Sequence, residues 1–309
     1  MTSFFKNLFG KSKPAALLTD SLVVKPKPSE PATIPVGKPI ELAEPLEPWP
    51  ISPQIAVGWG QSVGQQRDHN EDAIFIHSSM LISDNQPAPF GLFIVADGMG
   101  GHQHGEIASG MAIRAMATHV LQNLYIPIFS PVQESPDESL QEIMQAGIFE
   151  AHRAILKHAP GGGTTLTAML VMGDQMTVTH VGDSRAYLIS YPDYQIQPLT
   201  RDHSLVKRLE ELGQLTPEEA AQHPQRNVLY RALGQGEPFE PDINSYPLPL
   251  RGYVLLCSDG LWGIVPEKDI IRLINSTPDL HIVCQRLMEA ANKAGGPDNI
   301  SAILIRLTQ

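Results

Sequence analysis

The sequence predicts an α+β fold in which strands joined by short turns alternate with a few helices. Gly-Asp-Gln at 173–175 lies between two apolar runs, and a short turn within 181–185 separates the next pair, as in an antiparallel meander. Apolar residues recur at three-to-four spacing over 105–124 and 138–158, which indicates amphipathic helices. Hairpin-linked strands with separate helices favour α+β layering over a doubly wound sheet.

The individual strands are expected where short apolar runs are bounded by Gly, Asp or Asn. These runs lie at 55–59, 73–77, 92–96, 166–172, 176–181, 185–190, 253–257 and 301–307. A third helix is expected over 280–293, after the two named above. No repeat of roughly 20 to 50 residues is visible, so a solenoid is not expected.

Residues 1–50 differ in composition from the rest of the chain. They hold nine of the 27 prolines, which predicts a disordered, Pro-rich leader before a folded domain at 51–309. Within the leader, the segment 3–13 places apolar residues among lysines. That segment could form a short amphipathic helix in weak contact with a membrane surface or a partner, and the alternative is a frayed tail.

Charge and hydropathy limit the class of protein. The 309 residues include 22 basic and 33 acidic side chains, and the net charge of -11 disfavours binding to nucleic acid, whose phosphates must be neutralised. No apolar run reaches the roughly 18 residues of a membrane span, and no secretory signal is visible. We therefore expect a cytoplasmic protein without a transmembrane segment. Cys257 and Cys284 are too few for a disulfide framework or a thiolate zinc site.

Carboxylates occur repeatedly at the ends of the expected strands or just before the last one: Asp97, Asp183, Asp259 and Asp298. A single Asp-Gly pair is a common turn, but burial of several uncompensated carboxylates would cost several kcal/mol per ion. Nearby basic residues are too few to compensate them. Oxygen ligands without a His/Cys cluster select Mg²⁺ or Mn²⁺. Two such ions can share a deprotonated water, which is the chemistry of phosphoester hydrolysis.

A charged segment precedes the expected strand at 73–77. Arg67, Glu71 and Asp72 place one cation and two anions at the strand entrance. By itself this segment is more typical of a solvated charged loop than of a site.

The chain resembles the bacterial branch of the PPM (PP2C) family of metal-dependent serine/threonine protein phosphatases, over about residues 54–308. Its six motifs stand in the family's order and approximate spacing: Arg67-Asp68-His69-Asn70-Glu71-Asp72, Asp97-Gly98-Met99-Gly100-Gly101, Gly163-Thr164-Thr165, Gly182-Asp183-Ser184-Arg185, Ser258-Asp259-Gly260-Leu261 and Gly296-Pro297-Asp298-Asn299. The resemblance implies a four-layer αββα sandwich with two mostly antiparallel central sheets and a metal centre at one end. It also implies a monomer that acts on phosphorylated proteins.

Site roles follow from the same resemblance. The implied direct ligands of two Mn²⁺ or Mg²⁺ ions are Asp97, which bridges both, the carbonyl of Gly98, Asp259 and Asp298. Glu71 and Asp72 would act through metal-bound waters. Arg67 would clamp the substrate phosphate with its planar fork of donors.

Three further assignments keep alternatives open. Asp183 resembles a ligand of a third metal ion, or it is a turn residue. His102 could donate a proton to the leaving group, since Met99 stands where animal members have His, or it could be a helix-entry His bonded to the backbone. Residues 203–231 resemble a flap beside the active site, or they form a simple helix-turn excursion.

We therefore expect a phosphatase that hydrolyses phosphoserine and phosphothreonine on signalling proteins by in-line attack of a metal-bridging hydroxide. The alternative is a catalytically inactive, phosphatase-like module that binds phosphoproteins. A metal nuclease is a third possibility, which the acidic net charge disfavours.

Overall fold

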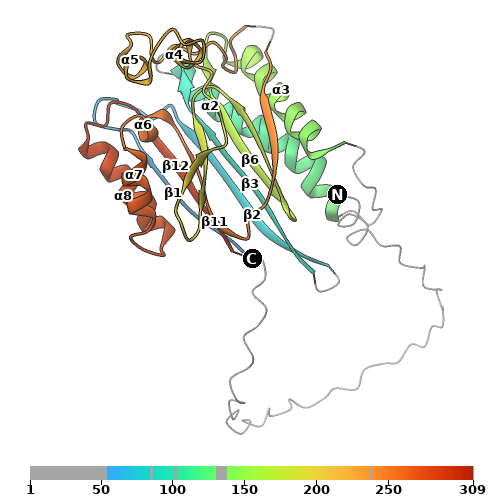
Figure 1. Ribbon diagram of the computed structural model, residues 1–309. Helices are drawn as coiled ribbons and strands as arrows, with labels where there is room; N and C mark the ends of the chain where they lie inside the picture. Colours follow the sequence, from blue (N-terminus) through green and yellow to red (C-terminus); the bar gives the residue numbers. More distant parts are fainter. Residues whose placement is uncertain (1–53, 84–85, 101–102, 130–137, 237–238, 309) are drawn as a thin grey trace, which may run out of the picture.

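Two five-stranded antiparallel sheets stack against each other in the computed structural model, which describes residues 54–83, 86–100, 103–129, 138–236 and 239–308 (Figure 1). The first sheet has the order β1 (Gln54–Ser62), β12 (Ile300–Thr308), β11 (Arg251–Cys257), β8 (Arg185–Ser190) and β9 (Ile196–Pro198). The second has the order β10 (Asp242–Pro247), β7 (Gln175–Val181), β6 (Leu166–Met172), β3 (Gln86–Ala96) and β2 (Ala73–Ser83). A short pair joins β4 (Gly98–Met99) to β5 (Gly163–Thr164).

The two faces of each central strand bury different cores. In β3, Phe93 and Val95 pack between the sheets, whereas Leu92 and Ile94 pack against the helices on the outer face. Side chains alternate along a strand, so a strand that is buried on both faces reads as a continuous apolar run. The end of β3 is therefore held from both sides where it leads into Asp97.

Helices cover the outer face of each sheet and one end of the sandwich (Figure 1). The second sheet carries α2 (Gln103–Val120) and α3 (Leu140–His158); α2 continues into a π-helical turn, Leu121–Tyr125, and a 3-10 turn, Ile126–Phe129. The first sheet carries α7 (Glu267–Ile274) and α8 (Leu280–Lys293). The short helices α4 (Leu205–Glu211), α5 (Pro217–Gln222) and α6 (Asp259–Trp262) lie at the end where the acidic strand ends meet.

The expected α+β, four-layer architecture is confirmed, with differences in element length. The strands expected at 55–59 and 73–77 are longer, because pairing with β12 and β3 extends them to Ser62 and Ser83. The helix expected from 138 begins at Leu140, since Ser139 caps it with a capping box to Glu142. The leader at 1–50, with its segment 3–13, lies outside the described residues, and no described helix could cross a membrane.

Candidate metal centre

Seven of the nine site residues expected from the sequence line one cavity of about 340 Å³ at the end of the sandwich: Arg67, Glu71, Asp97, Gly98, Asp183, Asp259 and Asp298. They come from the ends of different strands, which the antiparallel sheets bring to the same edge. Among the described residues, no three His, Cys, Asp or Glu side chains already form a coordination shell. The acids instead surround a shared space.

Asp72 lies beside this cavity and does not line it. Its Oδ2 accepts a hydrogen bond from Ser258 Oγ (2.8 Å), while its buried Oδ1 has no hydrogen-bond partner. Ser258 Oγ in turn accepts from Ser301 N (2.9 Å). The structure therefore places Asp72 behind the cavity, in contact with the residue that precedes Asp259.

Few positively charged groups lie near the acids of the cavity. Burial, with repulsion from neighbouring carboxylates, raises the pKa of Asp72 to about 7 and that of Asp259 to about 6. The same causes raise the pKa values of Asp97 and Asp183 well above the ordinary range, although Asp97 and Asp259 keep partial access to solvent. A divalent cation would supply the missing charge, and an all-oxygen donor set suits Mg²⁺ or Mn²⁺.

The main chain of Asp97 is fixed by two threonines. Asp97 N donates to Thr165 Oγ1 (2.9 Å), and Asp97 O accepts from Thr165 N (2.9 Å) and Thr164 Oγ1 (2.8 Å). Next to it, a Cβ at Gly98 would collide with the main-chain oxygens of Gly105 and Glu71. Glycine is required there because three backbone segments meet at this point.

Arg67 lines the cavity and contacts one of its acids directly. Its guanidinium donates to Asp298 Oδ2 (2.7 Å), and this hydrogen bond raises the arginine pKa. The Arg67 side chain is 51% exposed. Its remaining donors are therefore accessible to an anionic group that enters the cavity.

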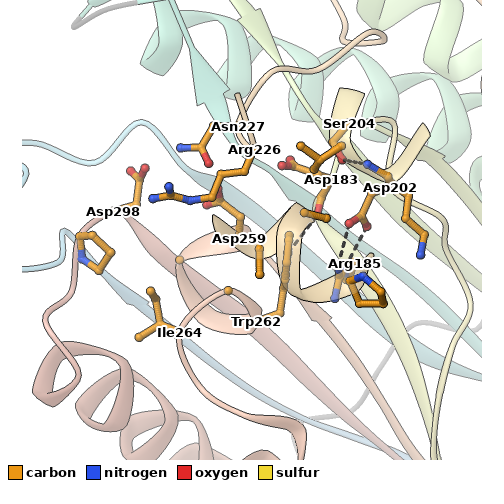
Figure 2. Close-up of a pocket in the computed structure, with 18 of the residues that line it drawn as sticks. Asp183, Arg185, Asp202, Ser204, Arg226, Asn227, Asp259, Trp262, Ile264 and Asp298 are labelled. Atoms are coloured by element: carbon orange, nitrogen blue, oxygen red, sulfur yellow. Dashed lines mark hydrogen bonds and ion pairs between the residues drawn. The ribbon is translucent and has the colours of Figure 1, made fainter. Parts of the chain in front are cut away.

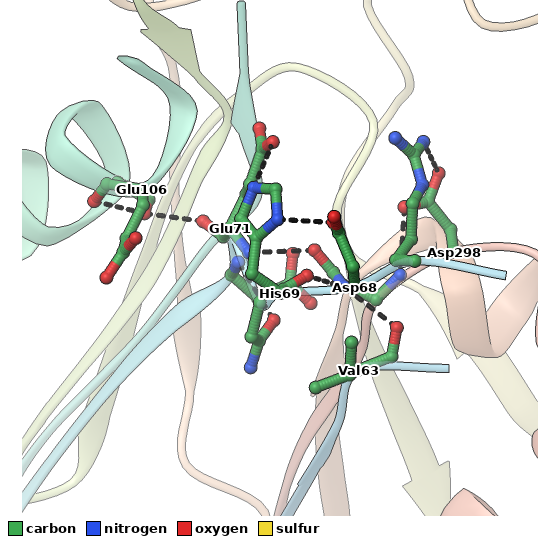
Figure 3. Close-up of polar contacts among 11 residues, drawn as sticks. Val63, Asp68, His69, Glu71, Glu106 and Asp298 are labelled. Atoms are coloured by element: carbon green, nitrogen blue, oxygen red, sulfur yellow. Dashed lines mark hydrogen bonds and ion pairs between the residues drawn. The ribbon is translucent and has the colours of Figure 1, made fainter. Parts of the chain in front are cut away.

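The structure assigns positioning roles to two motif residues, His69 and Asn299, for which the sequence predicted none. Figure 3 shows His69 among its polar contacts. His69 contacts Asp68 Oδ1 through Nδ1 (2.6 Å) and Glu71 Oε1 through Nε2 (3.1 Å), so it positions a predicted ligand. Asn299 accepts from Glu71 N (2.8 Å) and donates to the carbonyls of Val63 and His69 (both 2.9 Å). Asn299 thus ties the loop before β2 to the start of β12. Only the position of each residue beside a predicted ligand could have signalled its role.

Asp183 occupies the turn between β7 and β8 and is held from two sides. His203 N donates to Gly182 O (2.7 Å), and Gly182 N donates to His203 Nδ1 (3.2 Å). Trp262 Nε1 donates to Asp183 O (2.9 Å). Asp183 therefore faces the cavity from a braced turn, whereas His102 lies outside the described residues.

Comparisons with known proteins agree with this geometry. The family model described as "Protein phosphatase 2C" matches residues 59–304. A Listeria monocytogenes serine/threonine phosphatase, stp, is 35% identical over 248 residues, covering 80% of this chain and 94% of the relative. The Streptococcus pneumoniae protein phosphatase PhpP is 36% identical over 251 residues, covering 80% and 95%.

Solved structures show the same likeness. The Mycobacterium tuberculosis serine/threonine phosphatase PstP/Ppp superimposes with a TM-score of 0.68 at 31% identity, covering 82% of this chain and 99% of that one. The catalytic domain of PstP in complex with two manganese ions gives a TM-score of 0.67 at 29% identity, covering 84% and 100%.

Proposed function

Because the chain belongs to the protein phosphatase 2C family and is a metal-dependent serine/threonine protein phosphatase, we propose that the acids around its cavity hold the two metal ions of the reaction. The proposed direct ligands are Asp97, the carbonyl of Gly98, Asp259 and Asp298. Glu71 and Asp72 would act from the periphery through metal-bound waters, and Asp183 would contribute to a third ion.

The observation that carries this proposal is the excess of negative charge around one cavity. Asp97, Asp183 and Asp259 line this cavity, and desolvation together with repulsion from neighbouring carboxylates raises the pKa of each. Such a cluster is unfavourable in the absence of a cation. When bound, the paired cations would supply a deprotonated water at neutral pH and neutralise phosphoryl oxygens.

The chain's own residues would bind and orient the substrate. Arg67 presents a planar fork of donors at the cavity, which suits two oxygens of a phosphate monoester. His69 and Asn299 keep Glu71 in place, and Thr164 and Thr165 keep the main chain of Asp97 in place. We propose that His102 donates a proton to the leaving alkoxide, as the sequence resemblance implies.

The substrate is a phosphorylated protein, and its finer identity is a matter of proposal. We propose a cytoplasmic monomer whose catalytic unit is 51–309, with 1–50 as a leader that contacts a membrane or partner weakly through 3–13. An inactive phosphoprotein-binding module is not favoured, because Arg67, Asp97, Asp259 and Asp298 are all present in the cavity.

The test uses the purified full chain. With Mn²⁺ it should hydrolyse p-nitrophenyl phosphate and a phosphothreonine peptide, and EDTA should abolish both activities. Mn²⁺ binding by calorimetry should weaken in Asp97→Asn and remain unchanged in Asp193→Asn, an exposed acid outside the cavity. Activity that survives EDTA would contradict the metal mechanism, and unchanged Mn²⁺ binding by Asp97→Asn would contradict the ligand assignment. Cleavage of DNA in place of phosphopeptides would favour the nuclease alternative.

A further inference from the structure

A second cavity, of about 420 Å³, opens beside the metal centre under the α4–α5 segment (Figure 2). Residues that line both cavities include Arg67, Asp183, Asn227, Asp259 and Asp298. Because these residues line both, the two cavities are adjacent. A phosphopeptide with its phosphate at the metal centre would therefore extend part of its chain toward the second cavity.

Two groups of apolar residues, from different parts of the chain, line walls of this second cavity. Val206 of α4, with Ala220 and Ala221 of α5, contribute one wall. Trp262 at the end of α6 and Ile264 just after it contribute the other. Ala221 is exposed, and Trp262 and Ile264 are partly exposed, so a ligand can reach both walls.

Apart from the residues shared with the first cavity, most charged residues of the second cavity form ion pairs with one another. Arg185 donates from Nε and Nη2 to the two carboxylate oxygens of Asp202 (2.9 and 2.6 Å). Lys207 Nζ donates to Glu210 Oε1 (3.1 Å). Arg226 also lines the cavity, and its guanidinium points toward Asp298 at the metal centre (Figure 2). The side chains of Trp262 and Ile264 therefore favour contact with an apolar group.

Trp262 is already fixed in position. The guanidinium carbon of Arg185 lies 3.4 Å from the centroid of the Trp262 ring, and Asp202 holds that guanidinium in turn. The indole also donates to Asp183 O. An aromatic surface that is ordered before binding loses little conformational entropy when a ligand packs on it.

We propose that this cavity binds an apolar side chain of the phosphoprotein substrate, next to the phosphoserine or phosphothreonine. The inference rests on the proposed function and adds a substrate class to it: phosphorylation sites flanked by Leu, Ile, Met or Phe. Successive residues of an extended peptide are about 3.3 Å apart, so a residue close to the phosphorylated one can reach a cavity that shares its wall with the metal centre.

The first experiment measures kcat/KM of the full chain with Mn²⁺ on a set of phosphothreonine peptides. Each of the two positions on either side of the phosphothreonine carries Ala, Leu, Lys or Glu in turn. At one or more positions kcat/KM should be about tenfold higher for the Leu peptide than for the Ala peptide, mainly through a lower KM. Burial of the larger Leu side chain contributes a free energy of that size. Equal values for Leu and Ala at all four positions would overturn the inference while leaving the phosphatase activity established.

The second experiment alters the walls. Ala221→Glu and Ile264→Glu each add a carboxylate at a position that lines the cavity, and Ala221 is exposed, so its substitution does not threaten folding. Each variant should lose the preference for Leu and prefer Lys at the same position, with rates normalised to p-nitrophenyl phosphate. Leu212→Glu is the matched control, because Leu212 directly follows α4, is 55% exposed and does not line the cavity.

The outcomes distinguish failure of the apolar subsite from failure of the phosphatase activity. A reversal from Leu to Lys in both wall variants, absent from Leu212→Glu, supports the cavity as the subsite. An unchanged Leu preference in both wall variants overturns it, because the selectivity would then arise elsewhere. Absence of any Mn²⁺-dependent phosphopeptide hydrolysis by the wild type would overturn the proposed function and this inference with it.

Discussion

Replacement of Asp259 by Asn should stabilise the metal-free protein while removing its activity. Burial, followed by repulsion from Asp298, raises the pKa of Asp259 from 3.8 to about 6. The folded state therefore prefers the protonated acid, and the stability that protonation supports is present below pH 3.8 and lost as the pH rises through about 6. Each pH unit between these values is worth about 1.4 kcal/mol, so at pH 8 the ionised side chain costs the metal-free fold about 3 kcal/mol.

The assay is urea unfolding of the full chain at pH 8, followed by circular dichroism. In EDTA, Asp259→Asn should have a free energy of unfolding about 1 to 3 kcal/mol above the wild type, because the amide keeps the shape and removes the charge. In Mn²⁺ the difference in free energy of unfolding between the variant and the wild type should shrink or change sign. The reason is that the wild type gains about 3 kcal/mol when the metal is at a hundred times its Kd. Phosphopeptide hydrolysis by the variant should fall by about 10² or more.

Asp279→Asn is the control for this substitution. Asp279 is exposed and caps α8, and Asn caps a helix equally well, so neither stability nor activity should change. The reasoning would be refuted if Asp259→Asn were less stable than the wild type in EDTA while Asp279→Asn were neutral. The buried charge would then not be the unfavourable feature of the metal-free site.

Three further outcomes follow from single contacts. Arg67→Lys should lower kcat/KM by about 10 to 10²-fold, because an ammonium group cannot make the planar two-point contact, and an unchanged value would exclude phosphate clamping. Arg185→Lys should lower the free energy of unfolding by about 1 to 3 kcal/mol in urea titrations through the lost fork to Asp202 and the lost stack on Trp262, and full stability would contradict this. Burial lowers the pKa of His180 from 6.5 to about 4, so its stabilisation is complete above pH 6.5 and is lost toward pH 4. The wild type should therefore lose up to about 3 kcal/mol relative to His180→Gln over that range, and parallel pH profiles would show that His180 does not titrate as a buried group.

The sequence by itself predicted the features that depend on a few neighbouring residues. Each apolar run that ends in an acid, such as 92–96 before Asp97 and 253–257 before Asp259, predicts both a buried strand and the place where its carboxylate emerges. Alternation and turn chemistry act over a few residues, so they can be read without knowing the partner strand. Convergence of these acids followed from the family resemblance, and the structure places them around one cavity.

Contacts between distant segments were decided only by the tertiary structure. Asn299 binds Glu71 and the loop before it across more than 220 residues, and Asp72 turns to Ser258 behind the cavity. The stack of Arg185 on Trp262 joins the motif at 182–185 to the residue that follows the motif at 258–261. The pairing of polar groups in such places depends on how the two sheets pack and on which partners remain available after burial. The spacing of residues along one strand predicts neither of these.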